Sequence, residues 1–98
     1  MHLDAAIETL KSREQELRGL GVAHIALFGS LARGEADDES DIDILVDLQS
    51  DAPIGVFEYV GLIQFIEDVF SVKVDVANRA RLRPHVRPSA EREAVYAF

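Results

Sequence analysis

Two aspartates stand two residues apart in a stretch that alternates between apolar and acidic side chains. Over residues 41–48, Asp-Ile-Asp-Ile-Leu-Val-Asp-Leu, the pattern predicts a strand with aliphatic residues on one face and Asp41 and Asp43 on the other. Carboxylates at positions i and i+2 of a strand project from the same face, where their oxygens can share one or two hard divalent cations. The spacing therefore predicts a metal site at these two aspartates. Such a site is typical of enzymes that catalyse phosphoryl or nucleotidyl transfer.

A Gly-Ser pair ends a short apolar run that precedes these aspartates. The seven residues 22–28 predict a buried strand, and a short helix is expected over 31–33. Glycine lets a backbone approach a phosphate closely, and a serine hydroxyl with free N–H groups at a helix start binds phosphate oxygens. We therefore expect Gly29 and Ser30 to hold a phosphate group. A turn glycine and a helix-capping serine are the ordinary alternatives, and both are compatible with phosphate binding.

A third carboxylate, Asp75, lies in a later alternating stretch over residues 72–77. Its side chain is expected on the face opposite the three valines of that stretch. If this strand neighbours residues 41–48, three carboxylates meet and repel one another strongly unless a cation is bound. The ordinary alternative is an exposed strand residue beside Lys73.

The rest of the pattern predicts the elements that must position these side chains. An amphipathic helix is expected over 4–18, with Asp4 as its cap, and a second helix over 55–70. A last short helix is expected within 89–95. The order helix, strand, loop, strand, helix, strand, helix predicts an α/β (α+β) fold with a small mixed β-sheet flanked by helices. We expect one domain over residues 1–98.

Composition and charge limit the function classes. The chain of 98 residues has no cysteine, which excludes disulfides, zinc-thiolate sites and cysteine nucleophiles. It shows no signal peptide and no apolar stretch that could span a bilayer, so a cytoplasmic protein without a membrane partner is expected. The net charge of −8 predicts repulsion from nucleic-acid backbones and no direct nucleic-acid partner. Five arginines lie after residue 78, where they form either a solvated tail or a contact for an acidic partner or a triphosphate.

The motif residues together resemble a known signature. Residues 29–35, Gly-Ser-Leu-Ala-Arg-Gly-Glu, followed by Ser-Asp-Ile-Asp-Ile-Leu-Val-Asp at 40–47, are similar to the signature of the DNA polymerase β-like nucleotidyltransferase superfamily. More narrowly, the chain resembles the minimal nucleotidyltransferase (MNT) domains of prokaryotes. Members carry Gly-Ser, a spacer, Asp-x-Asp and a later aspartate on a neighbouring strand. Here ten residues separate Ser30 from Asp41, and Asp75 matches the later aspartate.

The resemblance implies an activity and a partner. It implies Mg²⁺ as cofactor and ATP as substrate, with Gly29 and Ser30 holding the triphosphate and Asp41 and Asp43 binding the metals. Asp75 would complete one metal site and help to activate the attacking hydroxyl. Similar MNT domains pair with a HEPN-domain RNase toxin and neutralise it by transferring AMP to one of its tyrosines. The chain is therefore expected to be a protein adenylyltransferase and the antitoxin of a type VII-like HEPN/MNT toxin–antitoxin pair.

Two other functions remain open on the sequence. A non-catalytic antitoxin would neutralise its toxin by binding, through the helix at 55–70 and the arginine-rich tail. That helix is apolar on more than one face, which fits either packing inside the fold or a partner surface. A small-molecule nucleotidyltransferase, for example one acting on antibiotics, would need a second subunit to complete its substrate pocket. Outside the motif chemistry, Arg33 is expected to pair with Glu35 or another carboxylate, and His24 to pack within its strand.

Overall fold

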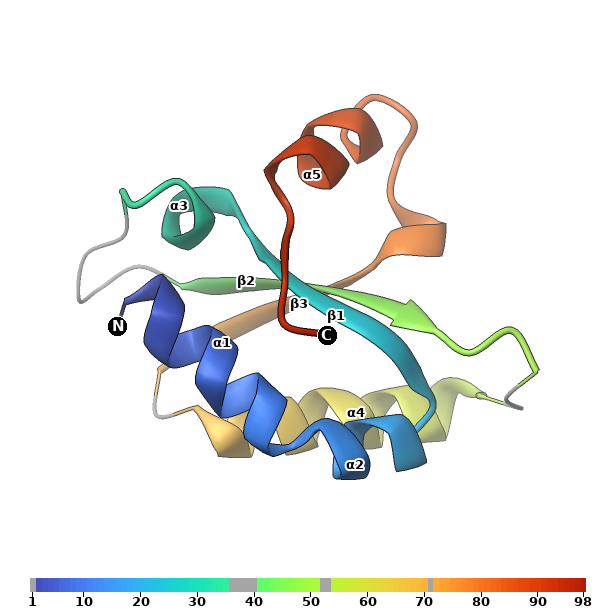
Figure 1. Cartoon of the computed structure of the whole chain (residues 1–98). Coiled ribbons are helices and arrows are strands. Elements are labelled where there is room, and N and C mark those ends of the chain that lie inside the picture. Colours follow the sequence, from blue (N-terminus) through green and yellow to red (C-terminus); the bar gives the residue numbers. More distant parts are fainter. Residues whose placement is uncertain (1, 36–40, 52–53, 71) are drawn as a thin grey trace.

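Four strands form one mixed sheet in the order β3-β2-β1-β4 (Figure 1). The computed structural model describes residues 2–35, 41–51, 54–70 and 72–98. β1 runs antiparallel to both β2 and β4, whereas β3 runs parallel to β2, so the predicted mixed sheet is confirmed. In chain order the elements are α1 Leu3–Ser12, α2 Glu14–Gly19, β1 Val22–Phe28, α3 Gly29–Ala32, β2 Ile42–Leu48, α4 Val56–Val69, β3 Val74–Asn78, the 3-10 helix η1 Arg79–Arg81, α5 Arg87–Glu93 and β4 Val95–Tyr96.

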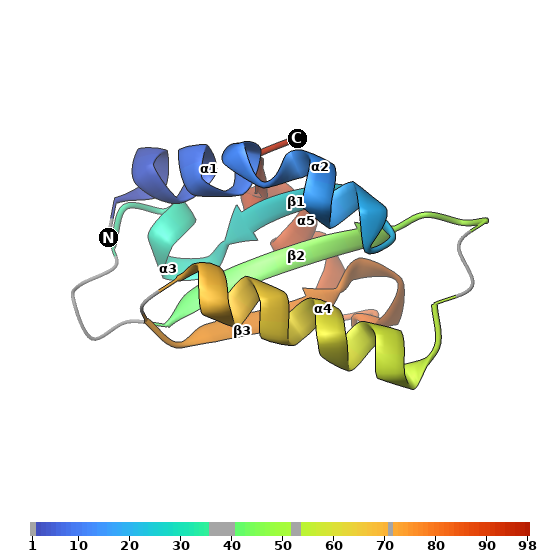
Figure 2. The ribbon, with the colours of Figure 1, turned by 90° about the horizontal axis from the view of Figure 1, so that it is seen from below.

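The apolar alternation of the two central strands builds the core on one face of the sheet. Ile25 of β1 and Ile44 and Val46 of β2 are fully buried there. α1, α2 and α4 lie against this face (Figure 2). They add to the same core the side chains of Ala6, Leu10, Leu17, Leu62 and Ile66. Burying each large aliphatic side chain contributes about 1.5–3 kcal/mol to the stability of the fold. This face therefore supplies much of the stability, and the other face can carry polar groups.

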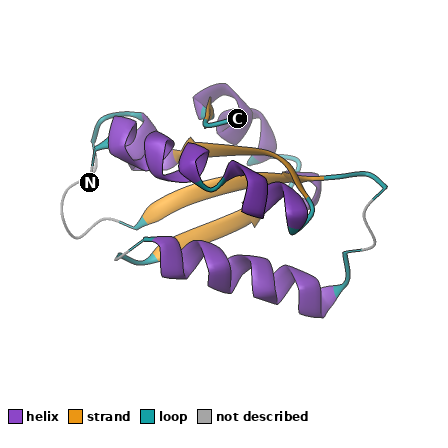
Figure 3. Ribbon diagram, turned by 60° about the horizontal axis from the view of Figure 1, so that its bottom comes forward, coloured by secondary structure: helices purple, strands orange, loops and turns teal. Residues whose placement is uncertain are grey.

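The second face of the sheet carries the acidic side chains. α5 lies on this side, above the sheet in Figure 1, as Figure 3 also shows. α3 lies at the end of the sheet, where its Leu31 joins the core of the first face. Only one residue of α5, Ala90, is buried. The sheet on this side is therefore covered in part, and Asp43 and Asp75 keep access to solvent.

The helices differ from the sequence prediction at their ends. The helix expected over 4–18 is divided at Arg13 into α1 and α2. Asp4 is not the cap: His2 holds that position without a side-chain bond, and Asp4 lies in the first turn, where its charge favours the helix dipole. The helix expected over 55–70 is α4, and Glu58 accepts a hydrogen bond from the N–H of Gly55 at its start, 3.1 Å away. None of the helices within the described ranges is long and apolar enough to cross a membrane.

The strands follow the prediction with shifted bounds. β1 matches the expected range, β2 begins one residue later, and β3 lies two residues later at its start and includes Asn78. β4 was not predicted, because two residues are too few to show an alternation. The polar stretch 36–40 and residues 52–53, both predicted as loop, lie outside the described residues.

Candidate active site

The backbone register brings the motif residues to one end of the sheet. β1 pairs Phe28 with Asp43 of β2, and β3 pairs Asp75 with the same Asp43. Residues paired across neighbouring strands project to the same face, so the side chains of Asp43 and Asp75 lie side by side. Gly29 follows Phe28 directly, so the Gly-Ser turn begins next to Asp43, and Asp75 lies on the other side of Asp43, on β3. The prediction that the strand of Asp75 neighbours the strand of Asp43 is confirmed.

Asp41 lies at the same end, immediately before β2. Its carboxylate is exposed, and Lys73 Nζ lies 3.8 Å from its Oδ2. The carbonyl of Lys73 also accepts a hydrogen bond of 3.0 Å from the N–H of Ile42. A pair of Lys73 with Asp75 was the ordinary alternative considered from the sequence, and the structure pairs Lys73 with Asp41 instead. The positively charged side chain of Lys73 therefore lies at the edge of the acidic cluster.

The electrostatics of the cluster act most strongly on Asp43. Its pKa is raised first by partial burial and then by the negative charges of Asp75 and Asp41, while the charge of Arg33 opposes the rise. Burial and like charges both disfavour the ionised carboxylate. A bound cation would offset both effects, so the position of Asp43 favours cation binding.

The three aspartates fit a hard metal by their chemistry, although they are not arranged around one point. Among the residues that the structure describes, no group of three acidic or histidine side chains is arranged to hold a metal ion. Unneutralised carboxylates repel one another, and Asp41 is drawn to Lys73. The available ligands are carboxylate oxygens, which suit Mg²⁺ better than softer metals. The donor type suits Mg²⁺, and the metal site at these aspartates stays a prediction.

Gly29 is required by its contact with Asp43. Its φ of 71° lies in the left-handed region that favours glycine. A Cβ placed on it would overlap the Oδ2 of Asp43 and lie 3.0 Å from the Cγ of that residue. The turn and the carboxylate are thus in direct van der Waals contact. α3 begins at Gly29 with Ser30 as its second residue, two positions earlier than predicted.

Arg33 fixes the helix of the motif to the C-terminal helix. Its Nε lies 3.1 Å from Glu35 and its Nη1 lies 3.0 Å from Glu93, the last residue of α5. The hydrogen bond to Glu35 and the charge of Glu93 raise the pKa of Arg33. The predicted pairing with Glu35 is confirmed. The pairing with Glu93, 60 residues away, was not predicted.

Part of the arginine-rich tail is used inside the fold. Arg79 pairs with Asp47 of β2 and with Glu91 of α5, at 3.2 Å in both cases. Arg87 lies 2.6 Å from the same Glu91. Hydrogen bonds from Arg87 and then Arg79 lower the pKa of Glu91. Arg79 thus attaches α5 to β2, whereas the pair of Arg87 with Glu91 lies within α5.

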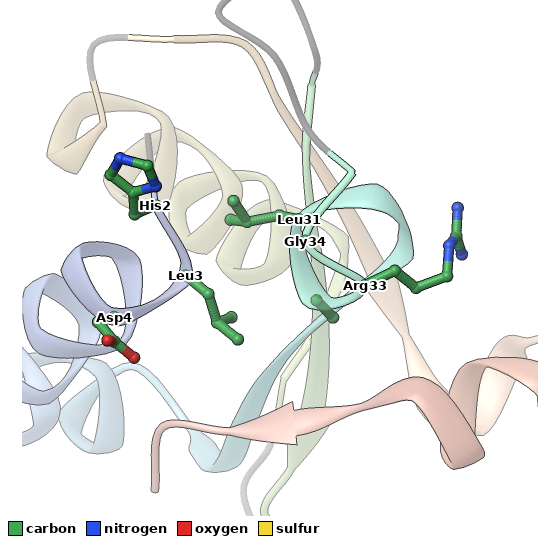
Figure 4. Close-up of a pocket in the computed structure, with 7 residues that line it drawn as sticks. His2, Leu3, Asp4, Leu31, Arg33 and Gly34 are labelled. Carbon is green, nitrogen blue, oxygen red and sulfur yellow. The ribbon is translucent and has the colours of Figure 1, made fainter.

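A cavity of about 450 Å³ lies between the start of α1 and α3 (Figure 4). His2, Leu3 and Asp4 line one side, and Leu31 to Gly34 line the other. Figure 4 shows the side chain of Arg33 directed away from the cavity. The aspartates of the cluster do not line it. The cavity is therefore separate from the acidic end of the sheet, where the sequence predicts the chemistry.

Comparisons with known proteins match this arrangement to a family. The chain matches the nucleotidyltransferase domain family over residues 3–97. Protein adenylyltransferase MntA of Thermococcus cleftensis is 35% identical over 88 residues, which cover 89% of this chain and 87% of the relative. MJ1379 of Methanocaldococcus jannaschii, named as a candidate protein adenylyltransferase, is 41% identical over 76 residues, which cover 76% of each protein.

Solved structures share the fold. A structure described as a candidate minimal nucleotidyltransferase matches with a TM-score of 0.71 at 30% identity, covering 97% of this chain and 95% of that chain. A toxin–antitoxin crystal structure with AMP-PNP matches with a TM-score of 0.70 at 20% identity, covering 90% of this chain and 72% of that chain, a likeness of fold alone. The sheet and helices thus have the polymerase β-like nucleotidyltransferase fold that the motif implied. The chain belongs to the nucleotidyltransferase domain family, as a minimal member.

Proposed function

We propose that this chain is a Mg²⁺-dependent protein adenylyltransferase that transfers AMP from ATP to a hydroxyl of a partner protein. The observation that carries the proposal is the register that sets Asp43 beside Asp75 and next to the turn at Gly29. Nucleotidyl transfer requires carboxylates that face a phosphate-holding turn. The relatives named as protein adenylyltransferases support AMP as the transferred group and a protein as its acceptor.

Each motif residue has a role in this proposal. Asp41, Asp43 and Asp75 would hold Mg²⁺, which when bound neutralises charge on the attacking and leaving oxygens. Gly29 and Ser30 would hold the triphosphate through the N–H groups of the turn and the serine hydroxyl. The contact between Gly29 and Asp43 supports this division, since it keeps the phosphate turn against the acidic cluster.

The transfer itself is a displacement at phosphorus. Asp75 is exposed beside Asp43, where it would accept the proton of the acceptor hydroxyl. The hydroxyl oxygen forms a bond to the α-phosphorus while the bond from that phosphorus to the bridging oxygen breaks in line. Pyrophosphate leaves with the electron pair of that bond. The acceptor thereby exchanges its proton for AMP.

We place the acceptor hydroxyl on a tyrosine of a HEPN-type RNase toxin, so that the chain acts as an antitoxin. The motif resemblance motivates this assignment, and the similar fold within a toxin–antitoxin structure supports it. The net charge of −8 also disfavours a nucleic-acid acceptor, because the phosphate backbone would be repelled.

The experiment uses purified protein, Mg²⁺ and ATP labelled at the α-phosphate, added to an extract of the source cell. Asp41→Asn/Asp43→Asn removes two of the proposed metal ligands. Asp47→Asn is the matched control, since it removes the same charge from the same strand as Asp43, four residues further on. A labelled protein band with the unchanged protein and the control, absent with the double variant, is the expected result. Mass spectrometry of the band then identifies the acceptor residue.

Two results would contradict the proposal. A labelled band that persists with Asp41→Asn/Asp43→Asn would place the chemistry outside the acidic cluster. A double variant that transfers no AMP yet neutralises the toxin at equal concentration would instead support an antitoxin that acts by binding.

A further inference from the structure

The helix that carries the Gly-Ser turn is a single turn long. α3 spans Gly29–Ala32. The backbone N–H of Arg33 donates to the carbonyl of Gly29 at 3.1 Å, and the N–H of Glu35 donates to the carbonyl of Ser30 at 2.8 Å. A helix of one turn has little stability of its own, because the first turn fixes many dihedral angles for few hydrogen bonds. Its orientation beside Asp43 must therefore come from contacts with the rest of the fold.

Side-chain contacts attach α3 to the fold on two sides. Leu31 is 4% exposed and belongs to the core of the first face. Arg33, which directly follows the helix, pairs with Glu93 of α5, with 3.0 Å between Nη1 and Oε2. Within the described ranges, no other ion pair joins residues 29–35 to a distant element. The core thus holds one side of α3, and Glu93 holds the other.

The sheet fixes the backbone position of Glu93. β4 pairs antiparallel with β1, and Val95 lies opposite Leu27. Glu93 comes two residues before Val95, and Gly29 comes two residues after Leu27. In an antiparallel pair, residues at these two positions lie beyond the same end of the pairing. The C-terminal strand therefore brings Glu93 to the end of β1 at which the Gly-Ser turn begins.

The guanidinium group of Arg33 meets two carboxylates in two directions. Its Nε donates to Glu35 at 3.1 Å, and its Nη1 donates to Glu93 at 3.0 Å. Because the guanidinium group is planar and donates in fixed directions, two partners determine its orientation. Glu35 follows Arg33 by two residues, whereas Glu93 belongs to another element. Only the contact with Glu93 can therefore hold α3 in place relative to the sheet.

We propose that Glu93 is a positioning residue for the triphosphate, since through Arg33 it holds the turn of Gly29 and Ser30 in the orientation that binds phosphate oxygens. The inference rests on the proposed function, in which this turn holds the triphosphate of ATP. Donors that are already in place bind an anion more tightly than donors that must first be ordered. Without Glu93, Leu31 would be the remaining anchor of α3, and the turn could tilt about it.

The sign of the effect separates positioning from simple electrostatics. Removing the negative charge of Glu93 would strengthen the binding of a triphosphate if charge alone mattered. The positioning role predicts the opposite. Glu93→Ala is expected to weaken binding by about three- to fivefold, which is the effect of losing one partly exposed ion pair.

The test is the Kd of two probes for the full chain in the presence of Mg²⁺, measured by isothermal titration calorimetry. The probes are AMP-PNP and inorganic triphosphate, which has neither base nor ribose. Glu93→Ala is expected to raise both Kd values. Glu91→Ala is the matched control, because it removes the same charge from the same helix and its ion pairs with Arg79 and Arg87 do not reach α3. It is expected to leave both Kd values unchanged.

A double variant tests whether Glu93 acts through Arg33. If it does, Arg33→Gln/Glu93→Ala binds both probes no more weakly than Arg33→Gln alone, because the contact is already lost in the single variant. Circular dichroism checks that each variant folds. Glu93→Gln repeats the measurement with an uncharged side chain of the same length and is expected to weaken binding in the same direction.

The outcomes separate this inference from the proposed function. A Glu93→Ala protein that binds both probes as tightly as the unchanged protein, or more tightly, would overturn the positioning role and leave the proposed transfer standing. So would an equal loss in Glu91→Ala, or a further loss when Glu93→Ala is added to Arg33→Gln. An unchanged protein that binds neither probe would overturn the proposed function and this inference together.

Discussion

Asp43 lies half-buried between two other carboxylates, and burial and their charges raise its pKa. In the metal-free protein its ionised form is therefore less stable in the folded chain than in the unfolded chain. Asp43→Asn removes this charge and is therefore expected to raise the Tm of the metal-free protein. Calorimetry in the presence of a chelator checks the prediction. The same substitution at Asp47, which is paired with Arg79, is expected to leave the Tm unchanged or lower it; an equal rise in both variants would disprove the explanation.

Gly29 and Gly34 offer a matched pair, because both have a positive φ and only one touches the cluster. Their φ angles are 71° and 75°, and a Cβ at Gly34 would meet nothing within 4 Å. Gly34→Ala is expected to destabilise the chain by about 1 kcal/mol through backbone strain alone. Gly29→Ala adds the overlap with the carboxylate of Asp43, which is expected to destabilise by a further ~1–3 kcal/mol and to lower the transfer rate. Urea unfolding of both variants measures the difference, and equal losses would show that the contact with Asp43 is unimportant.

The candidate residues could be predicted because they lie close together in the sequence. The types and spacing of Gly29, Ser30 and the Asp-x-Asp pair lie within fifteen residues of sequence. Contacts between distant residues leave no such pattern, so the pairing of Arg33 with Glu93 was missed. His24 was expected to pack within β1, yet it is exposed and meets the ring of Tyr96 edge-on, because it projects to the partly covered face.

At the scale of elements, Arg79 links Glu91 of α5 to Asp47 of the sheet. Glu91 accepts hydrogen bonds from Arg87 and Arg79, which lower its pKa below the ordinary value of 4.5. A carboxylate with a lowered pKa in the folded state stabilises that state above its ordinary pKa. The stabilisation is lost as the pH falls through the lowered value. Glu91→Gln is therefore expected to lower the Tm at pH 7 and to have no effect in strong acid. Thermal melts of both proteins from pH 7 downward check this, and a difference that does not change with pH would contradict it.

The elements themselves could be predicted where a hydrophobic period repeats several times. β1, β2 and α4 have such a pattern, and their predicted ranges agree with the structure within about one residue. β4 has two residues, and next to it Ala97 donates a backbone hydrogen bond to Ile25 of β1 and Phe98 accepts one from it. The break between α1 and α2 at Arg13 leaves the apolar spacing intact, so periodicity did not reveal it.

At the scale of the whole molecule, a net charge of −8 favours the binding of divalent cations over the binding of anions. Mg²⁺ is expected to raise the Tm of the unchanged protein, because ligand at ten times its Kd stabilises by about 1.4 kcal/mol. Asp41→Asn/Asp43→Asn is expected to lose most of this gain. Sodium chloride at the same ionic strength controls for screening. A gain that survives in the double variant would place the cation elsewhere on the acidic surface.

The most direct test of the central claim is the rate of AMP transfer between the purified chain and its purified acceptor. The claim is that the end of the sheet formed by Gly29, Asp43 and Asp75 carries out the transfer. With ATP and Mg²⁺ saturating, Asp43→Asn is expected to transfer AMP about 100- to 1,000-fold more slowly than the unchanged protein or more slowly still, while Asp47→Asn transfers at an unchanged rate. Equal rates for Asp43→Asn and the unchanged protein would contradict the account, because the carboxylate at the centre of the register would then have no part in the reaction.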